Sequence, residues 1–119
     1  MDKNSTIETL KFYRQISGEI ATYKSIYHEN GGIEEYKRKV ENLQNLKTQI
    51  LQEISRLNLK EKTIIFDYYI HGMKWEQVAE HNSYSARQCK NIRNTSIKSL
   101  SERFENNPYI KGFGKDMQK

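Results

Sequence analysis

The predicted helix over residues 85–104 carries side chains that can bind nucleic acid. Each residue of an α-helix advances by about 100° around the axis, so residues three and four apart share a side. The outward side holds Arg87, Asn91, Asn94 and Lys98, flanked by Lys90 and Thr95. Arginine can donate two hydrogen bonds to guanine and asparagine can form two with adenine, whereas lysine suits phosphates. Because the helix has no acidic residue before Glu102, this side predicts a surface for a DNA major groove.

Two further residues at the start of this helix belong to the predicted surface. Ser85 is placed to cap the helix, because a serine oxygen accepts a hydrogen bond from a backbone N–H of the first turn. Gln88 lies in that first turn, where its amide can approach base edges. The complete predicted DNA-binding set is Ser85, Arg87, Gln88, Lys90, Asn91, Asn94, Thr95 and Lys98.

The opposite side of the same helix is apolar and should pack inward. It consists of Ala86, Cys89, Ile92, Ile97, Leu100 and Phe104. Arg93 points toward this side, and we expect it to pair within the protein with Glu76 or Glu80. Cys89 is expected to be a small core residue rather than a reactive thiol. Trp75 is likewise expected in the core.

The excess positive charge of the chain is confined to its C-terminal third. The net charge is +5 at pH 7. Residues 85–119 hold eight Lys or Arg against three Asp or Glu, whereas residues 1–84 hold twelve of each. Localised basicity of this kind is typical of proteins that bind polyanions.

The elements that must position this helix are predicted to be helices as well. Apolar residues recur at spacings of three and four along most of the chain, which predicts an all-α fold. The first helix should cover residues 6–27 and the second residues 34–57, with a break at Asn30-Gly31-Gly32. Their apolar stripes are Tyr13, Ile16, Ile20, Tyr23 and Tyr27, and Tyr36, Val40, Leu43, Lys47, Ile50, Ile54 and Leu57. So short a link predicts an antiparallel hairpin over residues 1–57.

The hairpin has two interpretations. Tyrosines and Lys47 occupy positions where a tight coiled coil would carry Leu or Ile, so the pair buries little surface by itself. In the first interpretation the hairpin packs on the C-terminal part of its own chain. In the second it pairs with a second copy, giving a homodimer, or with a partner helix.

Three helices are predicted in residues 58–104, at 60–70, 75–81 and 85–104. Asn58 can cap the first of them and Gly72 ends it. A polar turn at Asn82-Ser83-Tyr84 joins the second to the third. Residues 105–119 are polar and contain Pro108 and two glycines, so we expect a flexible tail.

At these positions the chain resembles the fourth-region helix-turn-helix of bacterial sigma-70 factors, over about 45 residues. Residues 65–72 resemble the end of its leading helix, Val78-Ala79-Glu80 its first motif helix, and residues 85–92 its recognition helix. Lys74, Asn82 and Ser83 depart from the family pattern, which has a capping Ser or Thr, an apolar residue and a turn glycine there. The resemblance implies a three-helix DNA-binding domain that contacts double-stranded DNA and, as a further partner, RNA polymerase.

A short chain with a helical N-terminal half and this kind of C-terminal half resembles phage late-gene regulators of the RinA and ArpU type. That resemblance implies a transcription activator of late operons, acting in the cytoplasm of a bacterial host cell. A full sigma factor would also need a promoter-melting region, which a 56-residue hairpin cannot supply.

Several other functions are not supported by the sequence. We find no phosphate-binding glycine loop, nucleophile elbow or paired carboxylates, so we do not expect an enzyme or a cofactor. The single cysteine and three scattered histidines predict no metal site. No apolar run reaches about 18 residues, and residues 1–10 lack the pattern of a signal peptide, so we expect a cytoplasmic protein without a membrane span.

Two alternatives to a transcription regulator stay open. A small terminase-like DNA-packaging protein also combines a helix-turn-helix with helical oligomerisation segments, although such proteins usually place the DNA-binding part first. An adaptor that binds polymerase or a host regulator would use the tyrosine-lined hairpin for protein contacts.

Overall fold

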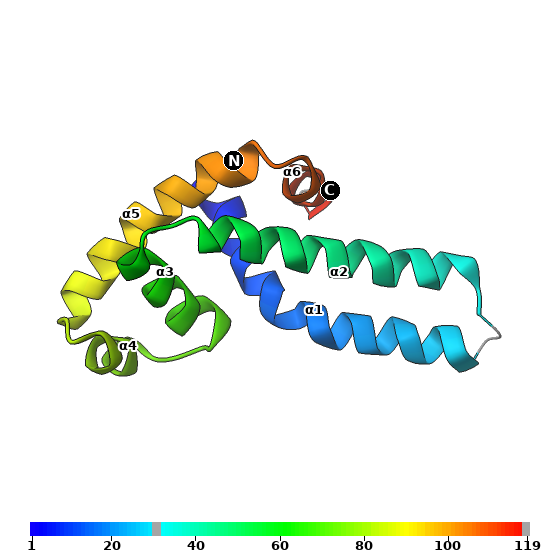
Figure 1. The fold of residues 1–119 in the computed structure, drawn as a ribbon, viewed down its shortest axis with the longest axis horizontal. Helices are drawn as coiled ribbons and strands as arrows, with labels where there is room; N and C mark the ends of the chain where they lie inside the picture. Colours follow the sequence, from blue (N-terminus) through cyan, green and yellow to red (C-terminus); the bar gives the residue numbers. More distant parts are fainter. Residues whose placement is uncertain (30–31, 118–119) are drawn as a thin grey trace.

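The computed structural model describes residues 1–29 and 32–117, with side chains as far as Phe113. The described residues form helices and no strand, which confirms the all-α prediction. The elements are α1 (Lys3–Glu29), α2 (Glu34–Ser55), α3 (Leu59–Ile65), η1 (Phe66–Ile70), α4 (Trp75–Asn82), α5 (Ala86–Glu105) and α6 (Pro108–Met117). The molecule measures 52 × 27 × 23 Å, because α1 and α2 project from a cluster of shorter helices (Figure 1). None of the described helices is long and apolar enough to cross a membrane.

The two long helices lie side by side and antiparallel, as the sequence predicted (Figure 1). Helix α1 begins three residues earlier than predicted, because Asp2 caps it: Ser5 N donates to Asp2 Oδ1 over 2.7 Å. Between the helices, Lys47 Nζ donates to Ser17 Oγ at 3.1 Å. Lys47 is therefore accommodated at the seam by a polar partner. Of the predicted break, Asn30 and Gly31 lie outside the described residues, and Gly32 has φ +77°.

Only one end of this hairpin is built into the main core. Leu10, Ile16, Ile50 and Ile54 are fully buried and share a cluster with residues of α5 and α6. Toward the free end the tyrosine side chains of the stripes are only half-buried. At its base, the hairpin therefore packs on the C-terminal part of its own chain, as in the first interpretation. The core continues across the domain boundary that we expected at residues 57–58.

Helices α3, α4 and α5 enclose a second, smaller cluster of Ile64, Val78 and Cys89, all fully buried. The predicted helix 60–70 changes geometry halfway: α3 is α-helical, whereas η1 is a π-helix that ends with His71 N donating to Phe66 O at 2.8 Å. Asn58 caps α3 as predicted, since its side chain accepts from Glu61 N at 2.9 Å. Gly72 follows η1 with φ +69°.

The prediction that residues 105–119 form a flexible tail is wrong for the described part. Pro108–Met117 forms helix α6, which packs against α2 and α5, and Ile110 is fully buried. Asn107 starts this helix, because its Oδ1 accepts from Tyr109 N at 3.1 Å. Its Nδ2 donates to Glu53 Oε2 at 2.9 Å, which joins the helix start to α2. An asparagine cap followed by proline is a recognised helix start, and it outweighs the two glycines here.

Candidate nucleic-acid interface

The start of α5 is fixed by two reciprocal hydrogen bonds. Gln88 N donates to Ser85 Oγ at 3.1 Å, and Ser85 N donates to Gln88 Oε1 at 2.8 Å. This capping box satisfies two backbone donors that would otherwise lack partners. Ser85 therefore caps the helix as predicted. Gln88 shares the same task, which leaves its side-chain NH₂ group available for a ligand.

The polar face of α5 is exposed throughout. We use this name for Arg87, Gln88, Lys90, Asn91, Asn94, Thr95 and Lys98, all of which are exposed, as is Ser85. On the opposite side Cys89, Ile97, Leu100 and Phe104 are buried, while Ala86 and Ile92 are half-buried. The helical period thus separates the two sets as the sequence predicted.

Some side chains of the polar face form hydrogen bonds within the protein, and others form none. Thr95 Oγ1 donates to Asn91 O at 2.9 Å, and Asn94 Oδ1 accepts from Arg93 Nε at 2.9 Å. Among the described residues, the side chains of Arg87, Asn91 and Lys98 have no hydrogen bond or ion pair. Arg87 and Asn91 lie one turn apart, so both can approach neighbouring bases.

The predicted partners of Arg93 are wrong. Arg93 Nη1 donates to Tyr69 Oη at 3.2 Å, and its guanidinium lies 5.2 Å from the centre of the Trp75 ring, whereas no ion pair with Glu76 or Glu80 occurs in the described part of the chain. Arginine stacks well on an aromatic face, and this contact needs no carboxylate.

Trp75 is half-buried rather than a central core residue. Its ring stacks on Tyr68 with centroids 4.0 Å apart and planes inclined by 16°. Lys90 and Arg93 of α5 both lie over the same ring. The stack therefore ties η1 and α4 to the middle of α5.

A buried carboxylate joins η1 to the end of α4. Asp67 is only 4% exposed. Its Oδ2 accepts from Asn82 Nδ2 at 2.9 Å and lies 2.6 Å from His81 Nδ1. Asn82 also donates to Val78 O at 2.8 Å. Asn82, which replaces the apolar residue of the family pattern, thus has a structural role. It donates a hydrogen bond to the carboxylate of Asp67, which would be costly to bury without a partner.

The turn before α5 contains a strained serine. Ser83 has φ +58° and ψ +37°, and it is the one residue other than glycine with positive φ in the described chain. The backbone conformation is therefore the left-handed one that a turn glycine adopts easily. For an L-residue it costs about 1–2 kcal/mol.

Replacing Ser83 with glycine should raise the free energy of unfolding, by up to about 1 kcal/mol. Glycine removes the steric cost at positive φ, although its freer unfolded chain offsets part of the gain. Urea unfolding followed by circular dichroism measures this difference. Ser83→Ala is the matched control and should give no gain, because alanine retains the Cβ. A destabilised glycine variant would show that the serine is not strained.

Cys89 lies in the second cluster as a core residue, as predicted. It is fully buried. Burial and, to a lesser degree, the charge of Asp67 raise the pKa of its thiol. The uncharged thiol that results at neutral pH is a poor nucleophile.

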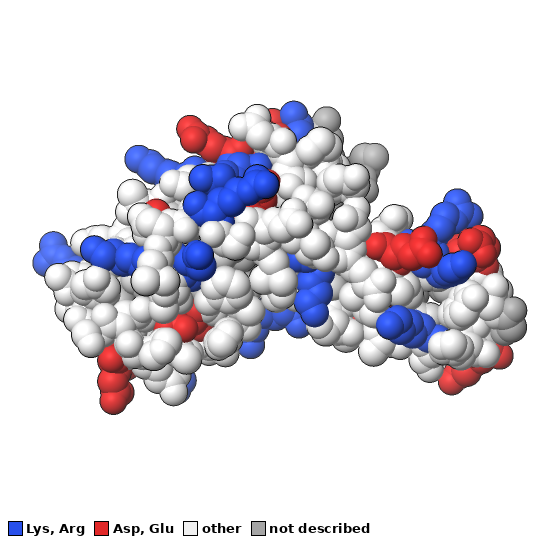
Figure 2. Space-filling view, viewed as in Figure 1, with Lys and Arg blue, Asp and Glu red and all other residues white. Residues whose placement is uncertain are grey.

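Basic side chains are spread over the α5 side of the molecule, whereas the free end of the hairpin carries both signs of charge (Figure 2). Glu76 and Glu80 are exposed on the neighbouring α4. On α5 itself, no acidic side chain occurs before Glu102.

Sequence reasoning missed the side chains that hold α5 in place. The Asp67–His81–Asn82 cluster and the Arg93–Tyr69 contact join residues 14 to 24 positions apart. Their one sequence signal was an acidic residue, Asp67, inside an otherwise apolar stretch.

Comparisons of this chain with protein-family models, with curated proteins and with solved structures gave no match.

Proposed function

We propose that this protein is a sequence-specific DNA-binding transcription regulator. Helix α5 enters the major groove, with Arg87, Asn91 and Asn94 at base edges and Lys90 and Lys98 at phosphates. Gln88 contributes its free NH₂ group, Thr95 lies beside the base contacts, and Ser85 fixes the end of the helix that approaches the DNA.

The observation that carries this proposal is the exposed polar face of α5, which has no acidic residue. The opposite side of the same helix is packed in the core. The face combines charge for phosphates with two residue types that recognise purines in pairs of hydrogen bonds. Its anchoring through Phe104, Cys89 and Arg93 supports the proposal, because a rigid helix loses little conformational freedom on binding.

The narrower proposal is a phage or prophage late-gene activator, with RNA polymerase as a second partner. It rests on the resemblance to sigma-70 region 4 and to the RinA and ArpU regulators. The free end of the hairpin is then available for a second copy or for polymerase.

Replacing Arg87 and Asn91 with alanine should weaken binding to the preferred DNA site at least tenfold. Each pair of hydrogen bonds to a base is worth about 1–3 kcal/mol of discrimination. The preferred site is first selected from a random duplex pool, and affinities are then measured by fluorescence anisotropy. Affinity for unrelated duplex should change far less.

The matched control is Arg38→Ala with Asn42→Ala. These are the same residue types at the same spacing, exposed on α2. The control should bind as the unmodified protein does. Equal affinity of the Arg87/Asn91 variant and the unmodified protein for the selected site would refute the groove assignment.

A further inference from the structure

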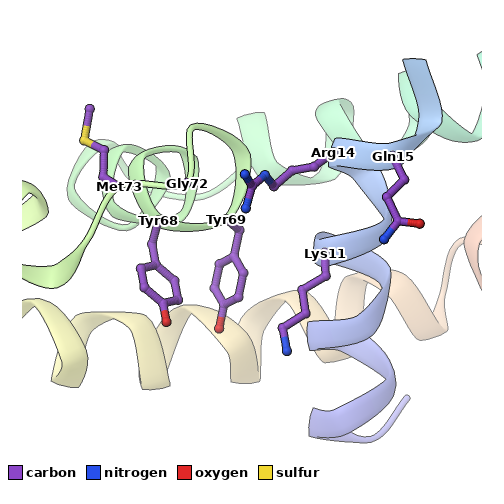
Figure 3. Close-up of a pocket in the computed structure, with 7 residues that line it drawn as sticks. All are labelled: Lys11, Arg14, Gln15, Tyr68, Tyr69, Gly72 and Met73. Carbon is purple, nitrogen blue, oxygen red and sulfur yellow. The ribbon is translucent and has the colours of Figure 1, made fainter. Parts of the chain in front are cut away.

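A cleft of about 580 Å³ lies between α1 and η1 (Figure 3). Lys11, Arg14 and Gln15 line it from α1, and Tyr68 and Tyr69 line it from η1. No acidic side chain is among the described residues that line it. Two cations and an amide suit a ligand that carries negative charge and several acceptor oxygens.

The guanidinium of Arg14 lies close to Gly72, which also lines the cleft. A Cβ added to Gly72 would lie 2.7 Å from Arg14 Nη2, so the guanidinium rests directly against the backbone of Gly72. Glycine is favoured there by the positive φ. Figure 3 shows the Arg14 side chain reaching from α1 across to the end of η1.

The charge of the cleft is poorly compensated within the protein. Lys11 Nζ lies 3.8 Å from Glu8 Oε1, and these side chains are 60% and 58% exposed. An ion pair this exposed is weak. Arg14 has no ion pair among the described residues. An external anion would therefore meet two available cations.

The cleft is connected to the polar face of α5 by Arg93 and by the Tyr68–Trp75 stack, over which Lys90 lies. Arg93 donates to Tyr69 Oη on the cleft side and to Asn94 Oδ1 on the other, at 3.2 and 2.9 Å. Helix α1 is also fixed across α5, since the hydroxyl groups of Thr6 and Ser101 lie 2.8 Å apart. The cleft and the polar face are thus held in one rigid arrangement.

We propose that this cleft binds a phosphodiester group of the DNA backbone beside the groove that α5 enters. This inference rests on the proposed function and extends the DNA-binding surface to α1. Arg14 grips two phosphate oxygens with its fork of N–H groups, and Lys11 adds a second charge. Such a contact carries no sequence information and fixes the register of α5 on the duplex.

The test removes both cations with Lys11→Gln and Arg14→Gln. Affinity for the selected site and for unrelated duplex should fall by the same factor, so specificity is unchanged. The slope of log Kobs against log salt should become shallower by about 0.9, since the cleft contacts one phosphate and each phosphate contact contributes about 0.9. Lys24→Gln with Arg38→Gln removes the same charge from exposed positions nearer the free end of the hairpin and should leave the slope unchanged.

Lys11→Gln alone avoids any effect on the packing of Arg14. It should make the slope shallower by less than about 0.9, because Arg14 still contacts the phosphate. An unchanged slope in both cleft variants would overturn the inference. Phosphate binding by the unmodified protein in DNA-free calorimetry, with no change in the DNA slope of the variants, would reassign the cleft to a free anion.

The two proposals fail in different ways. If Arg87→Ala with Asn91→Ala abolishes preference for the selected site while the cleft variants bind normally, only the inference about the cleft is wrong. If the unmodified protein binds no duplex at low salt, the proposed function is wrong and the cleft inference falls with it.

Discussion

Replacing Phe104 with alanine should lower the free energy of unfolding by about 3–5 kcal/mol. Phe104 is the largest fully buried side chain described, and it lies in the main core cluster, to which α1, α2, α3, η1, α5 and α6 contribute. Its removal leaves a cavity in this cluster, and the surrounding helical backbones cannot easily close it. Urea unfolding monitored by circular dichroism measures the loss.

The control for this variant is Glu102→Ala, an exposed position two residues earlier on α5. A surface change of this kind should alter stability by no more than about 0.5 kcal/mol. Because small domains have only about 5–15 kcal/mol of stability in total, DNA binding by the Phe104 variant must be measured at low temperature. A loss below about 1 kcal/mol would mean that Phe104 is not packed in a core shared by these helices.

Replacing Ile110 with alanine should cost about 2–5 kcal/mol, although the residue lies only nine positions before the end of the sequence. Ile110 is fully buried against the main cluster. The same urea titration measures the effect. A flexible tail would contribute nothing to stability, so this variant separates a docked α6 from a detached one.

Tyr109→Ala provides the neighbouring control, because Tyr109 is 58% exposed. It should change stability much less than the Ile110 variant. Equal and small effects of the two substitutions would show that α6 is not docked. The attachment also includes an ion pair of 2.8 Å between Lys111 and Glu105, and hydrogen bonding from Lys111 lowers the pKa of Glu105 to about 2.

Much of the fold follows from local sequence. Apolar spacing predicted both long helices and placed the polar face of α5 opposite its apolar side, because the helical period is set by backbone geometry alone. The caps at Asn58 and Ser85 were equally predictable, since a cap involves residues at most three positions apart.

Helix α6 was within reach of the sequence but was missed. Asn107-Pro108 is a local start signal, and Ile110 and Phe113 have the spacing of one helical side. Two glycines in ten residues argued against a helix on propensity. The structure resolves the conflict through burial of Ile110, because tertiary packing outweighs intrinsic propensity in short helices.

The features that position the candidate interface were decided by tertiary structure. Spacing along the chain does not predict that Asp67 is buried beside Asn82. It also does not predict that Arg93 donates a hydrogen bond to Tyr69. The cleft between Lys11 and Tyr69 likewise joins residues 58 positions apart. The sequence determined which side chains each helix presents on each side, because that depends on one dihedral pattern repeated locally. Which of those sides meet depends on how whole helices pack, and the free energy of that packing is shared among residues far apart in the chain.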